Sequence, residues 1–370
     1  MNEENGYEME TKMAEHRPAR RDFCARAICV SFFTAEVSDQ NPMRVGFVLP
    51  VERTQKSWYS DTYEGLVAAT DEMGATLYVE EHVPDSVAQG MDAIDRLHEK
   101  GVKIILSSQY GYGGLFLEAM RKYPDTNFYT VMPYQYGEKM STFFVRIYQL
   151  RYLQGMLAGM KTRTNRIGFV SYDREPDNVQ EINAFALGVR RVNPAAEVLV
   201  SFQRASTSTD AAACSVTERM IKSAGVDVVA SHRENDAVAE YAIENGVYAL
   251  ASYDDIADSP LLLSRQSINW QRVWSWLLKE NARKSNPRAF YWFDFIEAGM
   301  TFDVVSPDVT DEERALIESA KQDIENGFDP FSGNIRDNEG NVRCREGEFI
   351  SDFQRRQEIN WLVEGVRVYE

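Results

Sequence analysis

The sequence predicts an α/β protein made of two similar units in tandem, each a parallel sheet flanked by helices. Short strand-like segments alternate with helical ones after residue 42, and this rhythm runs twice along the chain. The strand-like segments are continuously hydrophobic, which indicates burial on both faces, as in a parallel sheet. The helical segments space their apolar residues by about 3.6 positions and end in glycine or proline.

The first unit begins at Met43. Its predicted strands are residues 45–48, 76–79, 103–108 and 127–132, and its predicted helices are 62–74, 87–101 and 114–124. A helix over 147–162 leads to the second unit. There the predicted strands are 166–172, 197–202, 226–232 and 247–253, and the predicted helices are 183–194, 217–225 and 236–246.

The pattern changes beyond about residue 260. A tryptophan-rich helix over 269–280, a strand-like segment over 298–305 and an acidic helix over 311–327 follow, and we expect them to cross back onto both units. The predicted first lobe is therefore 43–145 plus about 270–295, and the second is 146–268 plus about 296–370.

Composition narrows the function classes. The chain has 370 residues, enough for about two domains, and a formal net charge of −17, which opposes binding to nucleic acid. Its four cysteines form no CxxC pair and it has only four histidines, so neither a disulfide framework nor a metal site is predicted. No cofactor is predicted, and no run of 18 apolar residues predicts a membrane span.

Residues 1–42 are predicted to lie outside the fold, as a leader or a disordered tail. Arg20 and Arg21 precede an apolar stretch in the manner of a twin-arginine export signal. The alternatives are a cytosolic tail or a true start at Met43. Cys24 and Cys29 lack a small residue before them, so the sequence does not indicate lipid anchoring.

The sequence does not predict an enzyme. It has no GxSxG, HExxH, Walker A or SxxK motif. The glycine-rich segment 110–114 follows a strand, but it lacks the full GxGxxG spacing of a dinucleotide loop. His232 is the one histidine at the carboxyl end of a predicted strand, and a lone histidine there is more often structural. The spacing within 155–159 favours close packing of two helices.

Aromatic residues indicate a ligand cleft. Trp58 and Tyr59 follow the first predicted strand, and Tyr110 and Tyr112 follow the third. Both loops leave the same edge of a parallel sheet, so the rings can face one cleft from two sides. Stacking contributes about 1–3 kcal/mol per base, whereas micromolar affinity needs about 8 kcal/mol. Polar groups must therefore supply the remainder.

Acidic residues are candidates for that polar role. Arg233-Glu234 and Asp254-Asp255 follow strands of the second unit, where their carboxylates can accept hydrogen bonds from a ligand. The alternative is that these carboxylates cap helices. Arg233 adds a cation at the same edge and can neutralise Glu234.

Ten segments together resemble the basic membrane protein family of ABC-transporter solute-binding proteins, the purine and purine-nucleoside receptors. Among them are YLQGMLAGMKTRTNRIGFV, EINAFALGVRRVNPAAEV, GVDVVASH, GVYALASYDD and DIENGFDPFSGNIRDNEGNVR. The resemblance covers nearly all of 43–370. It implies the type I periplasmic-binding-protein fold, with two Rossmann-like lobes, three crossovers and closure about a hinge.

The resemblance also implies a function and a site. It implies a non-enzymatic receptor that captures a purine base or nucleoside, hands it to an ABC permease, and works outside the cytoplasm. By position, Trp58 looks like a stacking aromatic and Tyr110 looks like the ring that faces it. Glu234 and Asp255 look like the carboxylates of the second lobe, and the matching segment 268–270 adds Trp270 to the site.

Departures from the family pattern keep alternatives open. Gln55 and Tyr59 replace the Asp and Asn of the nucleoside-type loop, and 207–210 lacks a tryptophan commonly found there. A cytosolic ligand-sensing regulator of the same fold is one alternative. A nucleoside-processing enzyme is another.

Overall fold

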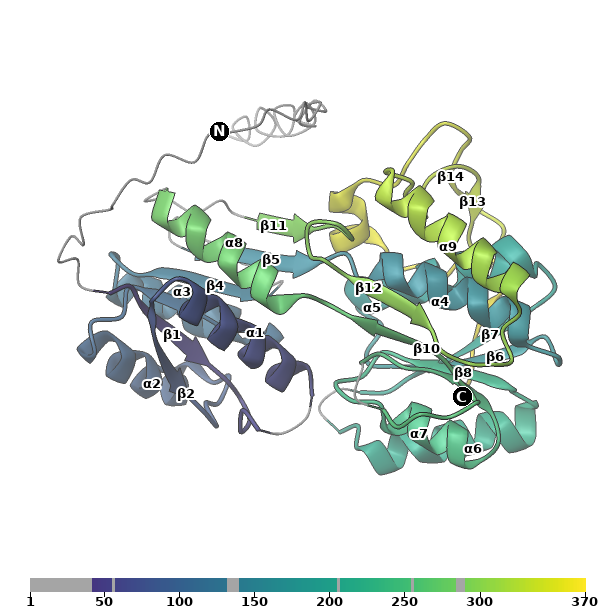
Figure 1. The fold of residues 1–370 in the computed structure, drawn as a ribbon, viewed down its shortest axis with the longest axis horizontal. Helices are drawn as coiled ribbons and strands as arrows, with labels where there is room; N and C mark the ends of the chain where they lie inside the picture. Colours follow the sequence, from purple (N-terminus) through teal and green to yellow (C-terminus); the bar gives the residue numbers. More distant parts are fainter. Residues whose placement is uncertain (1–41, 55–56, 132–139, 205–206, 254–255, 284–289) are drawn as a thin grey trace, which may run out of the picture. The chain divides into compact units, whose positions relative to one another are not determined.

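The structure, a computed structural model, describes residues 42–54, 57–131, 140–204, 207–253, 256–283 and 290–370. Within them the chain forms two large sheets, each covered by helices on both faces (Figure 1). The predicted α/β class with parallel-sheet lobes is confirmed. We call the six-stranded sheet with its helices the first lobe, and the seven-stranded sheet with its helices the second lobe.

The first lobe has strand order β11-β5-β4-β3-β1-β2, and all its neighbouring strands are parallel. Its strands are β1 (Arg44–Val48), β2 (Thr76–Glu80), β3 (Ile104–Leu106), β4 (Asn127–Val131), β5 (Met140–Val145) and β11 (Phe290–Phe293). Its helices are α1 (Trp58–Glu72), α2 (Val87–Glu99), α3 (Gly113–Lys122) and α8 (Trp270–Arg283), with the short turn η2 (Tyr110–Tyr112) before α3.

The second lobe has strand order β12-β10-β9-β8-β6-β7-β15, in which only β12 runs antiparallel to its neighbour among the described strands. Its strands are β6 (Arg166–Ser171), β7 (Glu197–Phe202), β8 (Val228–Ser231), β9 (Tyr248–Leu250), β10 (Leu262–Ser267), β12 (Thr301–Val304) and β15 (Val366–Val368). Its helices are α4 (Tyr148–Lys161), α5 (Pro176–Val192), α6 (Asp210–Ala224), α7 (Ala237–Glu244) and α9 (Asp311–Glu325).

After α9 the chain forms a small antiparallel hairpin and a π-helical turn. These are β13 (Ile335–Arg336), β14 (Val342–Cys344) and η3 (Gln354–Glu358). In the described part of the chain, the path passes between the two large sheets three times, after β5, β10 and β11. Three crossovers are what the family resemblance implied.

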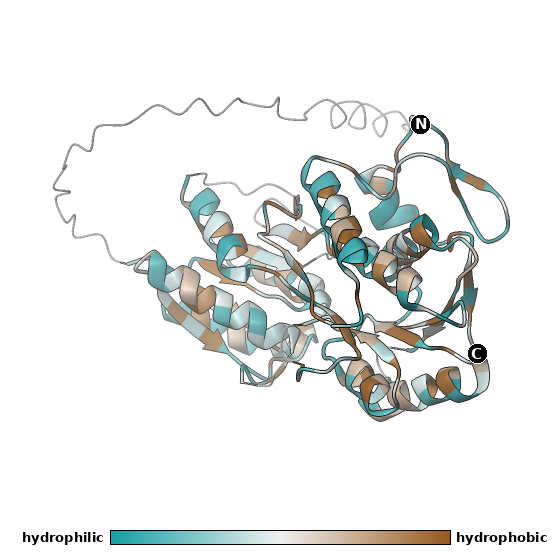
Figure 2. Ribbon diagram, turned by 45° about the vertical axis from the view of Figure 1, so that its right-hand side comes forward, coloured by the Kyte–Doolittle hydropathy of each residue, from teal (hydrophilic) through white to brown (hydrophobic). Residues whose placement is uncertain are grey.

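Both faces of each sheet are buried, as the continuous hydrophobicity of the strands predicted. Along β1, Val45 and Phe47 pack toward α1 and α8, while Val48 packs toward α2 and α3. In the second lobe, Leu199 packs toward α6 and α7, and Val200 belongs to the core on the other face. Figure 2 shows the hydrophobic colour concentrated on the strands, whereas the helices carry both colours.

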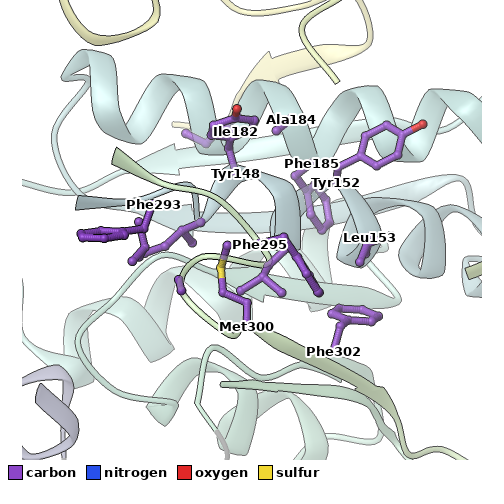
Figure 3. Close-up of a cluster of buried hydrophobic side chains, with 14 of the residues drawn as sticks. Tyr148, Tyr152, Leu153, Ile182, Ala184, Phe185, Phe293, Phe295, Met300 and Phe302 are labelled. Carbon is purple, nitrogen blue, oxygen red and sulfur yellow. The ribbon is translucent and has the colours of Figure 1, made fainter. Parts of the chain in front are cut away.

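Helices α4 and α5 pack closely because glycines stand where they cross. A Cβ on Gly155 would lie 1.9 Å from the carbonyl oxygen of Phe185, and one on Gly188 would lie 2.0 Å from that of Tyr152. The close packing predicted for 155–159 is therefore confirmed. Side chains of both helices continue into the core formed by β11 and the segment after it (Figure 3): Tyr148, Tyr152, Leu153, Ile182, Ala184, Phe185, Phe293, Phe295, Met300 and Phe302.

Candidate ligand-binding site

A cavity of about 830 Å³ lies between the two lobes, at the carboxyl ends of strands from both sheets. This volume falls in the range of about 300–1,000 Å³ that is typical of small-molecule sites. Of the seven residues predicted for the site, Trp58, Tyr59, Tyr110, Glu234 and Trp270 line this cavity. Tyr112 does not line it, and Asp255 lies outside the described residues, as does Gln55.

Trp58 stands at the first position of α1 and lines the cavity from the first lobe. The helix begins there because the side chain of Ser57 accepts a hydrogen bond from the backbone of Tyr59, and Ser60 bonds back to Ser57. The indole Nε1 of Trp58 donates to the carbonyl of Ser108 at 2.9 Å, and its ring meets that of Trp270 edge-on, 4.8 Å between centroids. These contacts fix the ring at the cavity wall.

Tyr59 links the two lobes at the edge of the cavity. Its hydroxyl lies 2.6 Å from Oε1 of Gln109 and 3.2 Å from Oε1 of Glu234 in the second lobe. Burial, together with the negative charge of Glu234, raises the pKa of Tyr59, so the hydroxyl keeps its proton and donates. The backbone N–H of Trp58 also donates to the carbonyl of Glu234, at 3.2 Å.

Tyr110 reaches across the cavity. Its ring is 41% exposed, and its hydroxyl donates to Oδ2 of Asp177 in α5 at 3.2 Å. The two residues come from different lobes, so this bond and the contacts of Glu234 with the start of α1 join the lobes at the cavity. The structure is thus closed around an interlobe space.

The prediction that Tyr112 faces the cleft is wrong. Its side chain is fully buried in the first-lobe core beside Phe116, and its hydroxyl donates to the carbonyl of Val83. The reason is the short 3₁₀ turn η2, which advances about 120° per residue. Residues two apart in such a turn do not share a face, so Tyr110 and Tyr112 cannot both face the cleft.

Arg233 does not depend on Glu234 for its partner. Its guanidinium pairs with Asp210 at 3.1 Å and donates to the hydroxyl of Ser208 at 2.7 Å. It also stacks on the ring of Tyr172, 5.0 Å from the centroid. Arg233 is therefore part of the second-lobe framework. Glu234 instead accepts hydrogen bonds from Tyr59 and Trp58 at the start of α1.

An ionic group on the second-lobe wall was not predicted from the sequence. Glu181 of α5 is buried, and its Oε2 accepts hydrogen bonds from Nε of Arg151 at 2.9 Å and from Nδ1 of His232 at 2.7 Å. Burial alone would raise the pKa of Glu181, but His232 and Arg151 outweigh it and lower this pKa to about 2. Glu181 is therefore an anion at any working pH.

The close crossing of α4 and α5 builds this group. Arg151 lies one helical turn before Gly155, on the same face of α4, and Glu181 lies two turns before Gly188 in α5. Arg151 has Gln149 and Gln154 near it in the helix, and Glu181 has Gln180 and Asn183, so neither charge stands out in the sequence. The sequence alone therefore gives no clear signal for the pair.

Asp177 is the second missed residue. It lies one turn before Glu181 in α5 and accepts the bond from Tyr110. Its removal from water raises the pKa of the carboxyl to about 7; the bond from Tyr110 opposes this rise and the charge of Glu181 adds to it. Asp177 therefore changes charge near neutral pH in the closed structure.

Two further observations concern the described residues only. No group of three or more His, Cys, Asp or Glu side chains there is arranged to hold a metal ion. No helix there is both long and apolar enough to cross a lipid bilayer.

Two lobes built on parallel sheets, with a cavity between them, define the type I periplasmic-binding-protein fold. Solved ABC-transporter solute-binding proteins share this fold. The family model "Bmp: ABC transporter substrate-binding protein PnrA-like" matches residues 43–268. The chain belongs to this family. Its members bind small molecules for ABC permeases and typically lie outside the cytoplasm.

Individual relatives have differing names. The chain is 25% identical to a purine-binding protein of Brucella abortus, over 88% of this chain and 93% of that one. It is 28% identical to TsgA13 of Haloferax volcanii, provisionally named an ABC transporter glucose-binding protein, over 84% of this chain and 73% of the relative.

A solved structure adds a third kind of relative. It is a transcriptional activator of the comK gene from Bacillus halodurans, which matches with a TM-score of 0.66 and 21% identity, over 78% of this chain and 99% of that one. Solute capture and gene regulation thus both occur among proteins similar to this chain.

Proposed function

We propose that this protein captures a purine base or purine nucleoside in the interlobe cavity and delivers it to an ABC permease outside the cytoplasm. The observation that carries the proposal is the pairing of an aromatic wall with a polar wall around one interlobe cavity. Trp58, Trp270 and Phe144 line it from the first lobe, and Arg151, His232 and Glu234 line it from the second.

A flat, apolar ring with polar edges fits such a space. Stacking on Trp58 and Tyr110 supplies about 1–3 kcal/mol per base, and each hydrogen bond to a charged group adds about 1.5–3 kcal/mol. A few such bonds reach the 8 kcal/mol or so of micromolar affinity. The likeness to the Brucella purine-binding protein, which extends over most of both chains, supports the same ligand class.

In this proposal the predicted site residues divide into two roles. Trp58 and Trp270 face the ligand ring, whereas Tyr59, Glu234 and Tyr110 also hold the lobes together through their bonds across the cavity. Asp255 remains a proposed ligand carboxylate. The proposed lobes are 43–145 plus about 270–295, and 146–268 plus about 296–370. The place of β11 in the first sheet and of β12 and β15 in the second supports these bounds.

A thermal-shift screen tests the ligand class. A compound that binds only the folded protein stabilises it by about 2.7 kcal/mol at a hundred times its dissociation constant. We expect such a shift from adenine, guanine, adenosine, guanosine or inosine, and none from sugars or amino acids. If glucose alone shifts the melting temperature, the proposed ligand class is a sugar and not a purine, in line with the name of the Haloferax relative.

A cytosolic ligand-sensing regulator is the second candidate, and the likeness to the Bacillus halodurans activator favours it. The same cavity would then report a ligand instead of delivering it. Cell fractionation separates the two: an extracytoplasmic protein supports delivery, and a cytosolic one supports sensing. Incubation with nucleosides followed by product analysis tests the third alternative, a nucleoside-processing enzyme.

A further inference from the structure

Arg151, Glu181 and His232 form one hydrogen-bonded group on the second-lobe wall of the cavity. A single atom, Oε2 of Glu181, accepts from both Arg151 and His232, at 2.9 Å and 2.7 Å. Arg151 and Glu181 are each only 3% exposed, so packing holds them in place. The positions of the arginine and the histidine relative to each other are therefore fixed by one carboxylate.

Two polar atoms of this group, one donor and one acceptor, make no hydrogen bond within it and are available to a ligand. Nη1 of Arg151 donates to Gln154 at 2.8 Å and to Ser252 at 3.3 Å, whereas Nη2 has no hydrogen-bond partner among the described residues. Nη2 is not among the buried polar atoms that lack a hydrogen-bond partner, so it is accessible to solvent. Because Arg151 lines the cavity, Nη2 is available to a ligand there.

His232 presents its second ring nitrogen to the same cavity. Because Nδ1 faces the carboxylate of Glu181, the tautomer with its proton on Nδ1 leaves the lone pair of Nε2 as an acceptor. Nε2 has no partner within the described part of the chain, and the side chain is 25% exposed. A group that served only to join α4 to α5 would have no reason to aim both nitrogens at the cavity.

The charges around Arg151 indicate an uncharged partner. Glu181 already neutralises its guanidinium, and the cavity is further lined by Asp61, Glu64 and Asp173. An anionic ligand would meet these carboxylates. A neutral acceptor, such as a ring nitrogen or a carbonyl, can take the Nη2 hydrogen bond without that repulsion.

We propose that Arg151 and His232 are specificity-determining residues that read the edge of an uncharged heterocycle, on which an acceptor lies beside an N–H donor, with Glu181 as their positioning residue. Nη2 of Arg151 donates to the acceptor, and Nε2 of His232 accepts from the N–H group. Aminopurines, with a ring nitrogen beside an amino group, and oxopurines, with a carbonyl beside a ring N–H, both carry this edge. This inference rests on the proposed function.

Isothermal titration with matched pairs of compounds tests it. The wild type is titrated with adenine, adenosine and inosine, and then with N6,N6-dimethyladenine, N6,N6-dimethyladenosine and 1-methylinosine, which lack the N–H donor. We expect the methylated compounds to bind about tenfold to a hundredfold more weakly, the loss of one hydrogen bond to a buried polar group. 1-Deazaadenine, which lacks the ring acceptor, should lose a similar factor.

Variants assign these losses to residues. We expect His232→Phe to weaken the parent compounds by about tenfold to a hundredfold and to leave the methylated ones unchanged, because the bond is already absent there. Arg151→Lys keeps a cation beside Glu181 and should abolish the preference for adenine over 1-deazaadenine. His98→Phe, at a histidine outside the cavity, is the matched control.

The outcomes separate the two proposals. If the wild type binds none of the parent purines, the proposed function fails and this inference fails with it. If it binds them, but both variants keep the full discrimination between parent and altered compounds, only this inference is overturned. If His232→Phe does not fold, the preference of Arg151→Lys for adenine over 1-deazaadenine alone tests this inference.

Discussion

The two walls of the cavity are built in different ways. On the first lobe, Trp58 and Trp270 are aromatic rings at the starts of helices, with few polar contacts. On the second lobe, Arg151 and Glu181 belong to the interiors of two tightly packed helices. Substitutions on the first wall should therefore change ligand affinity with little effect on fold stability, whereas substitutions on the second wall should change both.

The largest effect is expected on the second wall. Glu181→Ala leaves the buried Arg151 without its counter-charge, which typically costs about 3–5 kcal/mol of unfolding free energy. Denaturant melts measure this loss. The matched control is Glu197→Ala, which breaks an exposed pair with Arg367 and should cost about 0–1 kcal/mol. Equal small losses in both variants would show that the buried group does not support the fold.

Gly188→Ala tests whether the close helix crossing builds that wall. Its Cβ would lie 2.0 Å from a backbone oxygen of α4, so the helices must move apart, at about 1–3 kcal/mol of stability. Ligand affinity should fall as well, because the shift separates Arg151 from Glu181. The control Gly114→Ala meets nothing closer than 3.9 Å and should leave melting and binding unchanged. An unaltered melt for Gly188→Ala would contradict the close crossing.

On the first wall, Trp58→Ala should act on binding alone. Loss of stacking weakens purine affinity by about 1–3 kcal/mol, and the melting temperature should change little because Trp58 lies at the cavity edge. Trp276→Ala, at a tryptophan 41% exposed, is the control and should leave affinity intact. A destabilised Trp58→Ala variant with normal affinity would instead place Trp58 in the core.

Asp177 should make closure depend on pH. In the closed protein its pKa is about 7, whereas the same carboxyl in water ionises near pH 4, so raising the pH between these values favours the open form. Tyr110, Glu181, Arg356 and His232 are the groups that act on it. We expect affinity to fall by up to about a hundredfold from pH 5 to pH 8. Asp177→Asn should flatten this profile, and an unchanged slope in that variant would assign the effect to another group.

Tyr110→Phe should have the smallest effect. It removes the hydrogen bond from the Tyr110 hydroxyl to Asp177 and keeps the ring, so affinity should fall by about 0.5–1.5 kcal/mol. Titration measures this directly, with Tyr123→Phe, outside the cavity, as the control. A loss as large as that of Trp58→Ala would mean that the hydroxyl itself binds the ligand.

Much of the fold was predictable because strand burial and helix periodicity are local signals. Strands β1 to β4 and β6 to β9 fall where the hydrophobic runs predicted them. Strands β5, β10, β11 and β13 to β15 were not predicted. The polar residues of β10, such as Arg265 and Gln266, break its hydrophobic run, and β11 is a short strand that pairs with β5, far away in sequence.

The site was less predictable, because it depends on contacts between distant segments. Trp58, which follows the first strand, lines the cavity, but the turn geometry that buries Tyr112 was not visible in the sequence. The pairing of Arg151 with Glu181 requires the helix crossing at Gly155.

Mass spectrometry of the compound released by denaturing freshly purified protein tests the central claim most directly. Closure around the cavity should retain ligand through purification, so we expect a purine base or nucleoside in the released fraction, at a lower amount from Trp58→Ala than from the wild type. A released sugar or amino acid, with no purine and no dependence on Trp58, would contradict the proposed function.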